Sequence, residues 1–332
     1  MERKLATIQR VLSVESIPDA DKIETVKILG WAVVCKKEDQ IKVDQKIVYC
    51  SIDSVLPESN PYFEFLKDKK YRIKTCKFRG ALSQGICFPM SILPSGDYKE
   101  GDDITEILGI KLYEPLIPAY LHGLVEGFFP SYIPKTDEIR IQSEPGLLEE
   151  LKGKICYITV KVDGTSATFS HNNGEIKICG RNLAYKEEST NAYCEIFKRY
   201  DLGNKLKELG NYGIQGEIAG CGIQKNPLGL KQIDFFAFNV FDINAYQHLG
   251  YKEFVSICAK LGVKTVPILT DTFVFNHSIE QLLELSKGVY EGTKTPREGI
   301  VIRPLETTLS IILNGRLSVK VINNVYLLKC ED

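Results

Sequence analysis

Alternating apolar and polar positions recur in short segments through residues 1–113. Where apolar residues occupy every second position we predict β-strands, at Ala6–Val14, Glu24–Leu29, Trp31–Cys35, Lys46–Ile52 and Tyr71–Phe78. Gly30 and the pair Arg79-Gly80 mark turns between them. Several short strands in so small a segment favour a closed barrel. The leading prediction for residues 1–113 is therefore an OB-type β-barrel.

The periodic pattern stops over residues 114–149. Five of the chain's 14 prolines lie between Pro115 and Pro145, with several glycines among them. Because proline and glycine interrupt regular elements, we predict that this segment is a connector between two domains.

Strand-like and helix-like patterns mix from residue 150 to residue 332. Predicted strands lie at 155–162, 214–218, 233–242 and 299–303, and a predicted hairpin at 168–179 turns at Asn173-Gly174. Predicted helices lie at 190–209, 245–261 and 278–289. This order is not a regular βαβ alternation, so we predict an α+β domain of antiparallel sheets with flanking helices.

Composition narrows the class of protein. The 332 residues are 44% hydrophobic and 26% charged, which excludes a disordered or fibrous chain. Lys and Arg number 42 against 43 Asp and Glu, which excludes a uniformly basic nucleic-acid coat but not a local basic surface. No apolar run approaches the roughly 20 residues that span a bilayer, and no signal-peptide core follows Met1, so we expect an intracellular protein without membrane association. Ten cysteines without a C-x-x-C pair, and only four histidines, disfavour a structural zinc site.

The segment with the clearest chemical meaning is Lys161-Val162-Asp163-Gly164, at the end of a predicted strand. A lysine is a nucleophile only when neutral, and its ordinary pKa of about 10.4 makes deprotonation at neutral pH cost roughly 4 kcal/mol. Burial and a nearby cation lower that cost. Asp163 lies on the same strand face as Lys161, where it can bind a metal ion, and Gly164 allows close approach of a phosphate. The alternative is an ordinary strand end that enters an Asp-Gly turn.

Further short motifs follow in the order seen in one superfamily. Lys161-Val162-Asp163-Gly164 resembles motif I of the covalent nucleotidyltransferases, which comprise ATP-dependent ligases and mRNA capping enzymes. Motifs Ia, III, IIIa, IV and V have their counterparts at Cys179–Asn182, Gln215–Gly220, Phe235–Asp242, Glu298–Arg303 and Ser318–Asn323. Each motif alone is compatible with an ordinary core or surface segment. Six in the same order make the resemblance specific, and it implies that residues 150–332 are an adenylyltransferase domain.

The resemblance implies roles for the nucleophile and three carboxylates. Lys161 would attach AMP through its side-chain nitrogen. Glu217 would accept a hydrogen bond from a ribose hydroxyl, and Gly164 would line the nucleotide site. Asp163 and Glu298 would hold Mg²⁺ or Mn²⁺, directly or through water, because hard cations prefer oxygen ligands. Taken singly, Glu217 and Glu298 are equally compatible with exposed acids at strand ends.

Three other side chains receive roles in the same way. Arg181 would bind the 5′-phosphate of an incoming RNA strand, since a guanidinium matches phosphate oxygens. Phe238 would stack on adenine, although Phe241-Asp242 also fits the aromatic–acid pattern. Lys320 would neutralise the α-phosphate and help to lower the pKa of Lys161. Ordinary surface or core positions remain the alternative for each.

Motif V departs from the family pattern. Relatives often carry Lys-x-Lys there, whereas Val321 and Ile322 follow Lys320 in this chain. Either the second lysine has no counterpart in this chain, or Lys329 or Arg316 supplies the second positive charge at the phosphate.

Features outside the shared motifs resemble RNA ligases in particular. Thr165-Ser166 after the Asp-Gly pair resembles the RNA ligase form of motif I. Only twelve residues follow Lys320, which leaves no room for the C-terminal OB domain that DNA ligases and capping enzymes need. Ile17–Glu24, Ile52–Pro57 and Arg79–Gly85 resemble the N-terminal OB module of the Naegleria- and Deinococcus-type RNA ligases.

Basic residues concentrate in one segment of the predicted barrel. Residues 67–79 hold seven basic side chains and one acid, with Tyr71 and Phe78 among them. Such a surface can bind nucleic-acid backbone and stack bases, so we expect Lys74 and Arg79 to contact RNA. The alternative is a solvated, twisted hairpin.

Taken together, the motifs predict an ATP-dependent RNA ligase that acts through lysyl-AMP and RNA-adenylate. Its partners would be RNA with 3′-OH and 5′-phosphate ends, in a nicked duplex or an RNA–DNA hybrid, and its cofactors ATP and Mg²⁺ or Mn²⁺. We expect a monomer. The alternatives are a catalytically inactive nucleic-acid-binding relative and a DNA ligase or capping-type nucleotidyltransferase.

Overall fold

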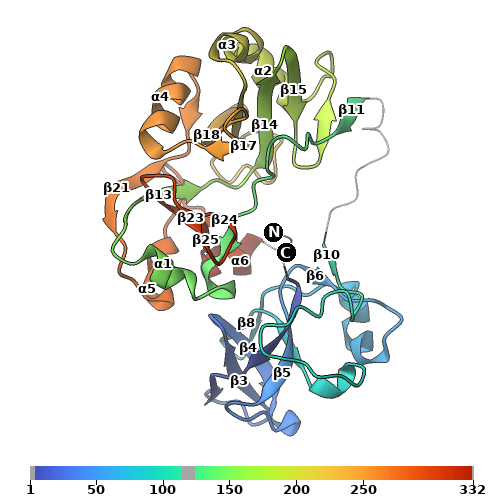
Figure 1. Ribbon diagram of the computed structural model, residues 1–332. Coiled ribbons are helices and arrows are strands. Elements are labelled where there is room, and N and C mark those ends of the chain that lie inside the picture. Colours follow the sequence, from blue (N-terminus) through green and yellow to red (C-terminus); the bar gives the residue numbers. More distant parts are fainter. Residues whose placement is uncertain (1–3, 114–123, 331–332) are drawn as a thin grey trace. The chain divides into compact units, whose positions relative to one another are not determined.

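The computed structural model describes residues 4–113 and 124–330, and its chain divides into two compact units (Figure 1). Unit 1 comprises Met1–Leu116, Gln142–Pro145 and Leu327–Asp332, and unit 2 comprises Ile117–Ile141 and Gly146–Tyr326. Part of the predicted connector, residues 114–123, lies outside the described residues. No helix within the described ranges is long and apolar enough to cross a bilayer.

Unit 1 is built from short antiparallel strands around one apolar core. One sheet has the order β1 (Ala6–Arg10), β5 (Lys46–Cys50), β9 (Ile86–Phe88), and a second the order β2 (Ser13–Ser16), β3 (Ile23–Ile28), β4 (Trp31–Lys36). Two small two-stranded sheets complete unit 1. One pairs β6 (Ser54–Val55) with β10 (Lys111–Leu112), and the other pairs β7 (Cys76–Phe78) with β8 (Ala81–Ser83). Trp31, Val33 and Cys35 alternate as buried residues along β4, as the period-2 pattern predicts.

Unit 1 differs from the predicted strands in several places. The segment predicted as one strand, Ala6–Val14, is divided between β1, which ends at Arg10, and β2, which begins at Ser13. Residues 71–75 are not a strand, and only Cys76–Phe78 pair with β8. The segment before them, Pro61–Lys69, is a 3₁₀ helix, η2, whose first turn is fixed by Pro61 and by the Asn60 side chain, which accepts from the Tyr62 N–H. Its buried residues Phe63 and Leu66 are three apart, the period of a 3₁₀ helix.

Unit 2 contains two larger sheets. The eight-stranded sheet has the order β11-β16-β15-β14-β17-β18-β19, with β20 beside β18. Its strands are β11 (Val125–Phe128), β14 (Thr165–Asn172), β15 (Glu175–Cys179), β16 (Leu183–Tyr185), β17 (Tyr212–Ala219), β18 (Asp234–Asp242), β19 (Gln247–His248) and β20 (Lys264–Thr265). The predicted hairpin is present, since Asn173 and Gly174 turn β14 into β15 with positive φ at both residues.

The five-stranded sheet has the order β12-β25-β22-β13-β21. Its strands are β12 (Ile139–Arg140), β13 (Ile155–Lys161), β21 (Ile268–Val274), β22 (Gly299–Pro304) and β25 (Val319–Ile322), and a small hairpin joins β23 (Leu309–Ser310) to β24 (Gly315–Arg316). Strand β21 was not predicted; its exposed residues leave no clear run of buried positions to detect. Residues 124–149 of the predicted connector supply β11 and β12 to these sheets.

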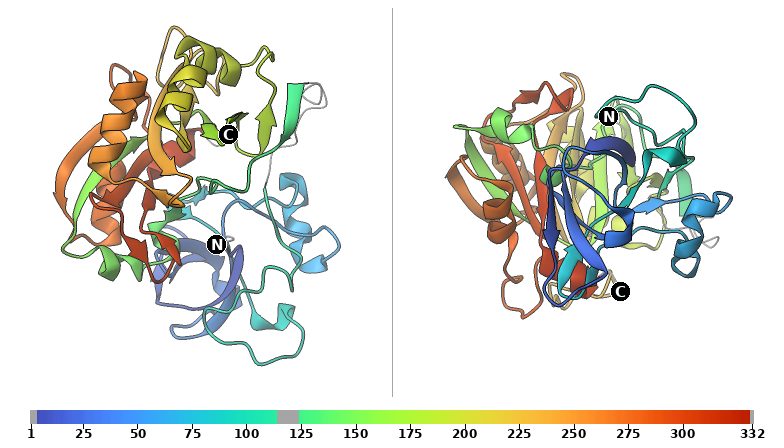
Figure 2. Two further views of the ribbon diagram at one scale, coloured as in Figure 1. Left: turned by 45° about the horizontal axis from the view of Figure 1, so that its top comes forward. Right: turned by 90° about the horizontal axis from the view of Figure 1, so that it is seen from below.

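Helices cover one face of each sheet. Helices α2 (Ala192–Arg199), α3 (Leu202–Leu209) and α4 (Tyr251–Leu261) pack on the eight-stranded sheet (Figure 2, yellow and orange helices). Helices α1 (Leu147–Leu151) and α5 (Ile279–Ser286) pack on the five-stranded sheet, and α6 (Asn324–Cys330) ends the described chain. The single helix predicted at 190–209 is broken at Asp201, whose φ of 50° is left-handed, and the helix predicted at 245–261 begins only at Tyr251.

Side chains alternate between the two faces of a strand, so every second residue points away from the face that the helices cover. That uncovered face can carry polar groups. On the five-stranded sheet, Ile158, Ile300 and Val321 point into the core under α1 and α5. The residues between them therefore point to the other face, among them Lys161 and Lys320. The predicted site residues of this sheet thus lie on the face that these helices leave uncovered.

Candidate active site

Strand pairing places Lys161 beside Glu298. Lys161 is the last residue of β13 and lies opposite Gly299, the first residue of the antiparallel neighbour β22. Glu298 directly precedes β22, and the Lys161 Nζ donates to its Oε2 at 2.7 Å. Both side chains are mostly buried, with 27% and 17% of their surfaces exposed. Two motifs 137 residues apart in sequence thus form one ion pair.

The charge environment holds Lys161 protonated in the nucleotide-free protein. Burial alone would lower its pKa, but attraction to Glu298 and Glu217 outweighs burial and raises the pKa above the ordinary lysine value. Repulsion between Lys161 and Lys320 acts in the opposite direction, as predicted for Lys320, but does not outweigh the carboxylates. Added positive charge near these carboxylates would favour the neutral amine.

Three carboxyl groups, those of Glu298, Glu217 and Asp163, act on Lys161. Glu217 lies on β17 opposite Ser166, and burial together with the charges of Glu298 and Asp163 raises its pKa to about 8. Burial also raises the pKa of Asp163, whose side chain is hydrogen-bonded to Tyr326. This excess of negative charge suits a site that receives a cation.

Asp163 and Glu298 have the chemistry of a partial metal site. In residues 4–113 and 124–330, no three His, Cys, Asp or Glu side chains are grouped closely enough to bind one ion. Mg²⁺ commonly binds through one or two carboxylates and takes its remaining ligands from water and substrate phosphates. Two carboxylates beside a site of excess negative charge fit that pattern.

Gly164 lies where the chain after motif I crosses β17. A Cβ at this position would come within 2.2 Å of the Ile218 carbonyl oxygen, so no larger residue fits without movement of the backbone. The carbonyl of Gly164 accepts from the Gln224 Nε2 at 3.1 Å, and the next residue, Thr165, shares a 2.8 Å hydrogen bond with the Tyr193 hydroxyl. Gly164 is thus required for close packing, and its neighbours fix the turn.

A β-bulge sets the direction of Phe238. Gly216 pairs with Ala237 and Gln215 with Asn239, so Phe238 is the extra residue of β18 and has no partner on β17. Its half-buried ring lies in a small apolar cluster with Val162, the residue directly after Lys161. The alternative stacking residue, Phe241, is buried and contacts the rings of Tyr246 and His248 instead.

Asp137 brings Lys320 and Arg181 together. Lys320 lies on β25 opposite Val301, and its Nζ donates to the Asp137 Oδ1 at 2.8 Å. Arg181, which is 62% exposed, reaches the other oxygen of Asp137 at 3.7 Å. Burial lowers the pKa of Lys320, and the positive charge of Lys161 acts in the same direction. Asp137 was not predicted, because it lies in the segment assigned to the connector.

Arg316 belongs to a buried network of polar side chains. Its guanidinium donates to the Asn239 Oδ1 at 2.6 Å and to the Tyr157 hydroxyl at 3.2 Å. Arg316 is therefore committed to the bulge of β18 and does not replace the missing motif V lysine. Lys329 lies in the part of α6 that belongs to unit 1.

A second arginine supports the same bulge. Arg303, only 2% exposed, donates to the Phe238 carbonyl at 3.2 Å, to the Glu138 Oε1 at 2.6 Å and to the Ser318 hydroxyl at 2.9 Å. A bulge leaves backbone groups without ladder partners, and Arg303 supplies a donor for one of them. Glu138 was not predicted either, since its partner lies 165 residues away in sequence.

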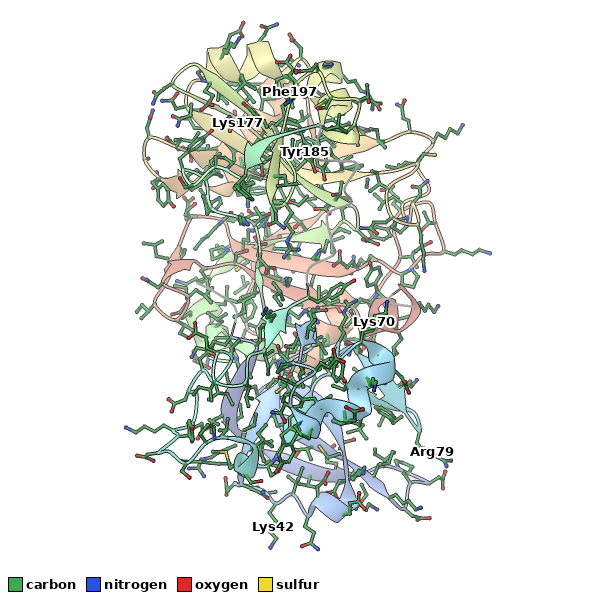
Figure 3. All side chains as sticks on the ribbon, turned by 90° about the vertical axis from the view of Figure 1, so that its right-hand side faces the viewer. Lys42, Lys70, Arg79, Lys177, Tyr185 and Phe197 are labelled. Atoms are coloured by element: carbon green, nitrogen blue, oxygen red, sulfur yellow. The ribbon has the colours of Figure 1, made fainter. Side chains whose placement is uncertain are left out.

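Two of the predicted RNA-binding residues, Lys74 and Arg79, lie on unit 1, whereas Arg181 belongs to unit 2. Lys74 is partly buried and precedes β7, and Arg79 is exposed in the β7–β8 turn with a left-handed φ of 48°. Figure 3 shows the Arg79 side chain pointing outward from this unit. The exposed Tyr62 and Phe65 of η2 add aromatic surface to the same segment of the chain.

Comparisons with known proteins agree with the motifs and the two sheets. Residues 154–322 match the RNA ligase family model, and residues 5–90 match a model of an OB-fold domain. Solved structures of the Naegleria gruberi RNA ligase are 37% identical to this chain. A glutamate-to-alanine variant with ATP and Mn aligns with a TM-score of 0.89 over 99% of this chain and 100% of that one. The enzyme with PPi, and a lysine-to-methionine variant with AMP and Mn, align with TM-scores of 0.88 and 0.89 over 98% of each chain.

The two family matches and the similarity over nearly the whole chain agree with one another. The chain belongs to the RNA ligase family. The predicted OB-type barrel and the predicted α+β class are confirmed. Among curated protein sequences no significant match is found.

Proposed function

We propose that this protein is an ATP-dependent RNA ligase that joins a 3′-OH to a 5′-phosphate through a lysyl-AMP intermediate and an RNA-adenylate. The observation that carries the proposal is the Lys161 ammonium at 2.7 Å from Glu298, within the field of Asp163 and Glu217. The Naegleria variants whose structures have been solved support it. They include substitutions of a lysine, an aspartate, two glutamates and a second lysine, the residue types and order of the site in this chain.

In the first step Lys161 loses a proton and its nitrogen attacks the α-phosphorus of ATP. The new N–P bond forms as the bond from the α-phosphorus to the bridging oxygen breaks, and pyrophosphate leaves with that electron pair. The Glu298 carboxylate is placed to accept the lysine proton at 2.7 Å. Lys320 then faces the charge that develops on the phosphoryl oxygens.

The remaining steps transfer AMP to RNA and seal the strand. The RNA 5′-phosphate displaces the lysine to form RNA-adenylate, and a 3′-hydroxyl then displaces AMP to form the phosphodiester. Arg181 would bind the 5′-phosphate, Glu217 the ribose and Phe238 the adenine face. Asp163 and Glu298 would hold Mg²⁺ or Mn²⁺, whose charge would shield the phosphates.

Basic residues of unit 1 would also bind RNA. Lys74 and Arg79 belong to a segment rich in lysine, arginine and aromatic residues, a composition that binds nucleic-acid backbone and stacks bases. The substrate would be a nicked duplex or an RNA–DNA hybrid, and the enzyme a monomer. In Naegleria gruberi, the similar enzyme is named an RNA ligase.

The decisive experiment incubates the protein with α-labelled ATP and follows label on the protein, then adds nicked RNA, hybrid and DNA duplexes. We expect stable labelling from ATP but not from GTP or NAD, and sealing of nicks with a 5′-phosphorylated RNA strand. Lys161→Ala should not become labelled. Labelling from GTP would indicate a capping-type enzyme, sealing of DNA alone a DNA ligase, and no labelling an inactive relative.

The contribution of unit 1 can be tested separately. Neutralising Lys74 and Arg79 together should weaken strand joining more than lysine adenylylation, because only joining requires RNA. Lys42→Ala, which removes an exposed lysine elsewhere on unit 1 (Figure 3), is the matched control. Equal loss of both activities in the double variant would argue against RNA contact by these residues.

A further inference from the structure

One tyrosine hydroxyl connects the three parts of the proposed reaction centre. Tyr290, which is 4% exposed, lies in the segment between α5 and β22. Its hydroxyl donates to the Lys161 carbonyl at 3.0 Å and accepts from the backbone N–H of Asp163 at 3.0 Å and of Glu298 at 3.1 Å. The backbone of the nucleophile and of both proposed metal-binding residues thus meets at one oxygen atom.

These contacts use the full hydrogen-bonding capacity of the phenol. A tyrosine hydroxyl has one donor and two acceptor sites, and all three are occupied by backbone groups. Tyr290 therefore has no free valence for ATP, RNA or a metal ion. Its role is to position other residues.

Strand geometry explains why such a contact is needed here. The β13–β22 ladder ends with the pair of Lys161 and Gly299, so Glu298 and Asp163 lie beyond the last paired residues. Ladder hydrogen bonds can no longer fix the spacing of these two backbone segments. The Tyr290 hydroxyl bridges them where the ladder has ended.

The segment that carries Tyr290 is itself firmly held. The Arg297 guanidinium donates to the carbonyls of Leu285, Ser286 and Lys287 at the end of α5, at 2.7, 3.1 and 2.6 Å. The Thr293 hydroxyl donates to the Tyr290 carbonyl at 2.9 Å. A tyrosine on such a support can impose a fixed distance rather than follow its neighbours.

We infer that Tyr290 is a positioning residue that sets the arrangement of Lys161, Asp163 and Glu298 for adenylylation. The inference rests on the proposed function and adds a residue that lies in none of the six motifs. Removal of the hydroxyl leaves the two amides without their buried acceptor and loosens both carboxylates relative to the lysine.

The test compares Tyr290→Phe with Tyr200→Phe, a control that removes another hydroxyl of unit 2, one that donates to Asp234. Single-turnover adenylylation is measured with α-labelled ATP over a range of ATP and Mn²⁺ concentrations. Tyr290→Phe should lower the rate at saturating ATP on the order of tenfold to hundredfold and raise the half-saturating Mn²⁺ concentration, with little change in half-saturating ATP. The control should match the wild type in all three.

Hydrogen exchange followed by mass spectrometry provides a readout independent of activity. The Asp163 and Glu298 amides should be protected in the wild type and should exchange faster in Tyr290→Phe, with the rest of unit 2 unchanged. The inference is overturned if these amides are unprotected in the wild type, if exchange rises throughout unit 2, or if the variant keeps the wild-type rate and Mn²⁺ dependence. Absence of labelling in the wild type would instead count against the proposed function, while the exchange result would still stand.

Discussion

Replacing Glu138 with glutamine is expected to destabilise unit 2 by roughly 3 kcal/mol at pH 7. Glu138 accepts from the Arg303 guanidinium at 2.6 Å, and only 17% and 2% of the two side chains are exposed. Burial alone would raise the pKa of Glu138, but Arg303 overrides burial and lowers the pKa to about 2. Glutamine keeps the size of the side chain and removes the charge that Arg303 faces.

The magnitude follows from that pKa. A fall from 4.5 to about 2 corresponds to roughly 3 kcal/mol of preference for the folded protein, in line with the cost of breaking a buried ion pair. A depressed carboxyl pKa stabilises the fold above the unfolded pKa, and this stabilisation is lost as the pH falls from about 4.5 to about 2. The difference between wild type and variant should therefore shrink to roughly 1 kcal/mol at pH 3.

Urea unfolding followed by hydrogen exchange can measure the loss of stability in each of the two units separately. Peptides from β22 and β25 should lose protection in Glu138→Gln at pH 7, and peptides from unit 1 serve as the internal reference. Glu126→Gln removes an exposed carboxylate that pairs with Lys177, and it should cost no more than about 0.5 kcal/mol. An unchanged stability at pH 7, or a loss that stays constant down to pH 3, would refute this account of the buried pair.

Three other perturbations test the geometry of the site. Because burial and neighbouring carboxylates raise the pKa of Glu217 to about 8, the nucleotide-free protein should lose stability as the pH rises from about 4.5 to 8, and melting curves of Glu217→Gln should show a flatter dependence. Gly164→Ala places a Cβ 2.2 Å from the Ile218 carbonyl oxygen, so it should abolish labelling by ATP and lower the melting temperature. Arg316→Gln should lower stability because Arg316 holds Asn239, but half-saturating ATP should change less than it does in a variant that loses a phosphate contact.

Secondary-structure predictions were correct where neighbouring residues in the sequence determine the element. The hairpin at Asn173-Gly174 has the turn residues and the flanking alternation that define it, and the structure places β14 and β15 around it. The long helix predicted at 190–209 failed because nothing in the apolar spacing reveals the left-handed residue Asp201. The 3₁₀ helix at Pro61–Lys69 was not predicted, because its three-residue period resembles neither an α-helix nor a strand pattern over a short window.

The same distinction between local and tertiary signals separates the site residues that were predicted from those that were missed. Lys161 and Asp163 lie together in sequence, and the family resemblance added Glu217, Glu298 and Lys320. Residues that act only through tertiary contacts were missed. Tyr290 joins two motifs through backbone groups, and no composition or spacing around it distinguishes it from other core tyrosines. Glu138 and Asp137 were likewise missed, because Arg303 and Lys320, to which they are hydrogen-bonded, lie more than 100 residues away.

The charge around Lys161 in the nucleotide-free protein bears on how ATP and the divalent cation bind. Lys161 is held as an ammonium because Glu298 and Glu217 attract its charge more strongly than burial opposes it. Phosphate groups arriving alone would add negative charge and hold the proton still more firmly. A divalent cation that arrives with the nucleotide would offset the carboxylates and favour the neutral amine. The rate of adenylylation should therefore depend on pH most steeply when the divalent cation is scarce, and that dependence should weaken as the cation approaches saturation.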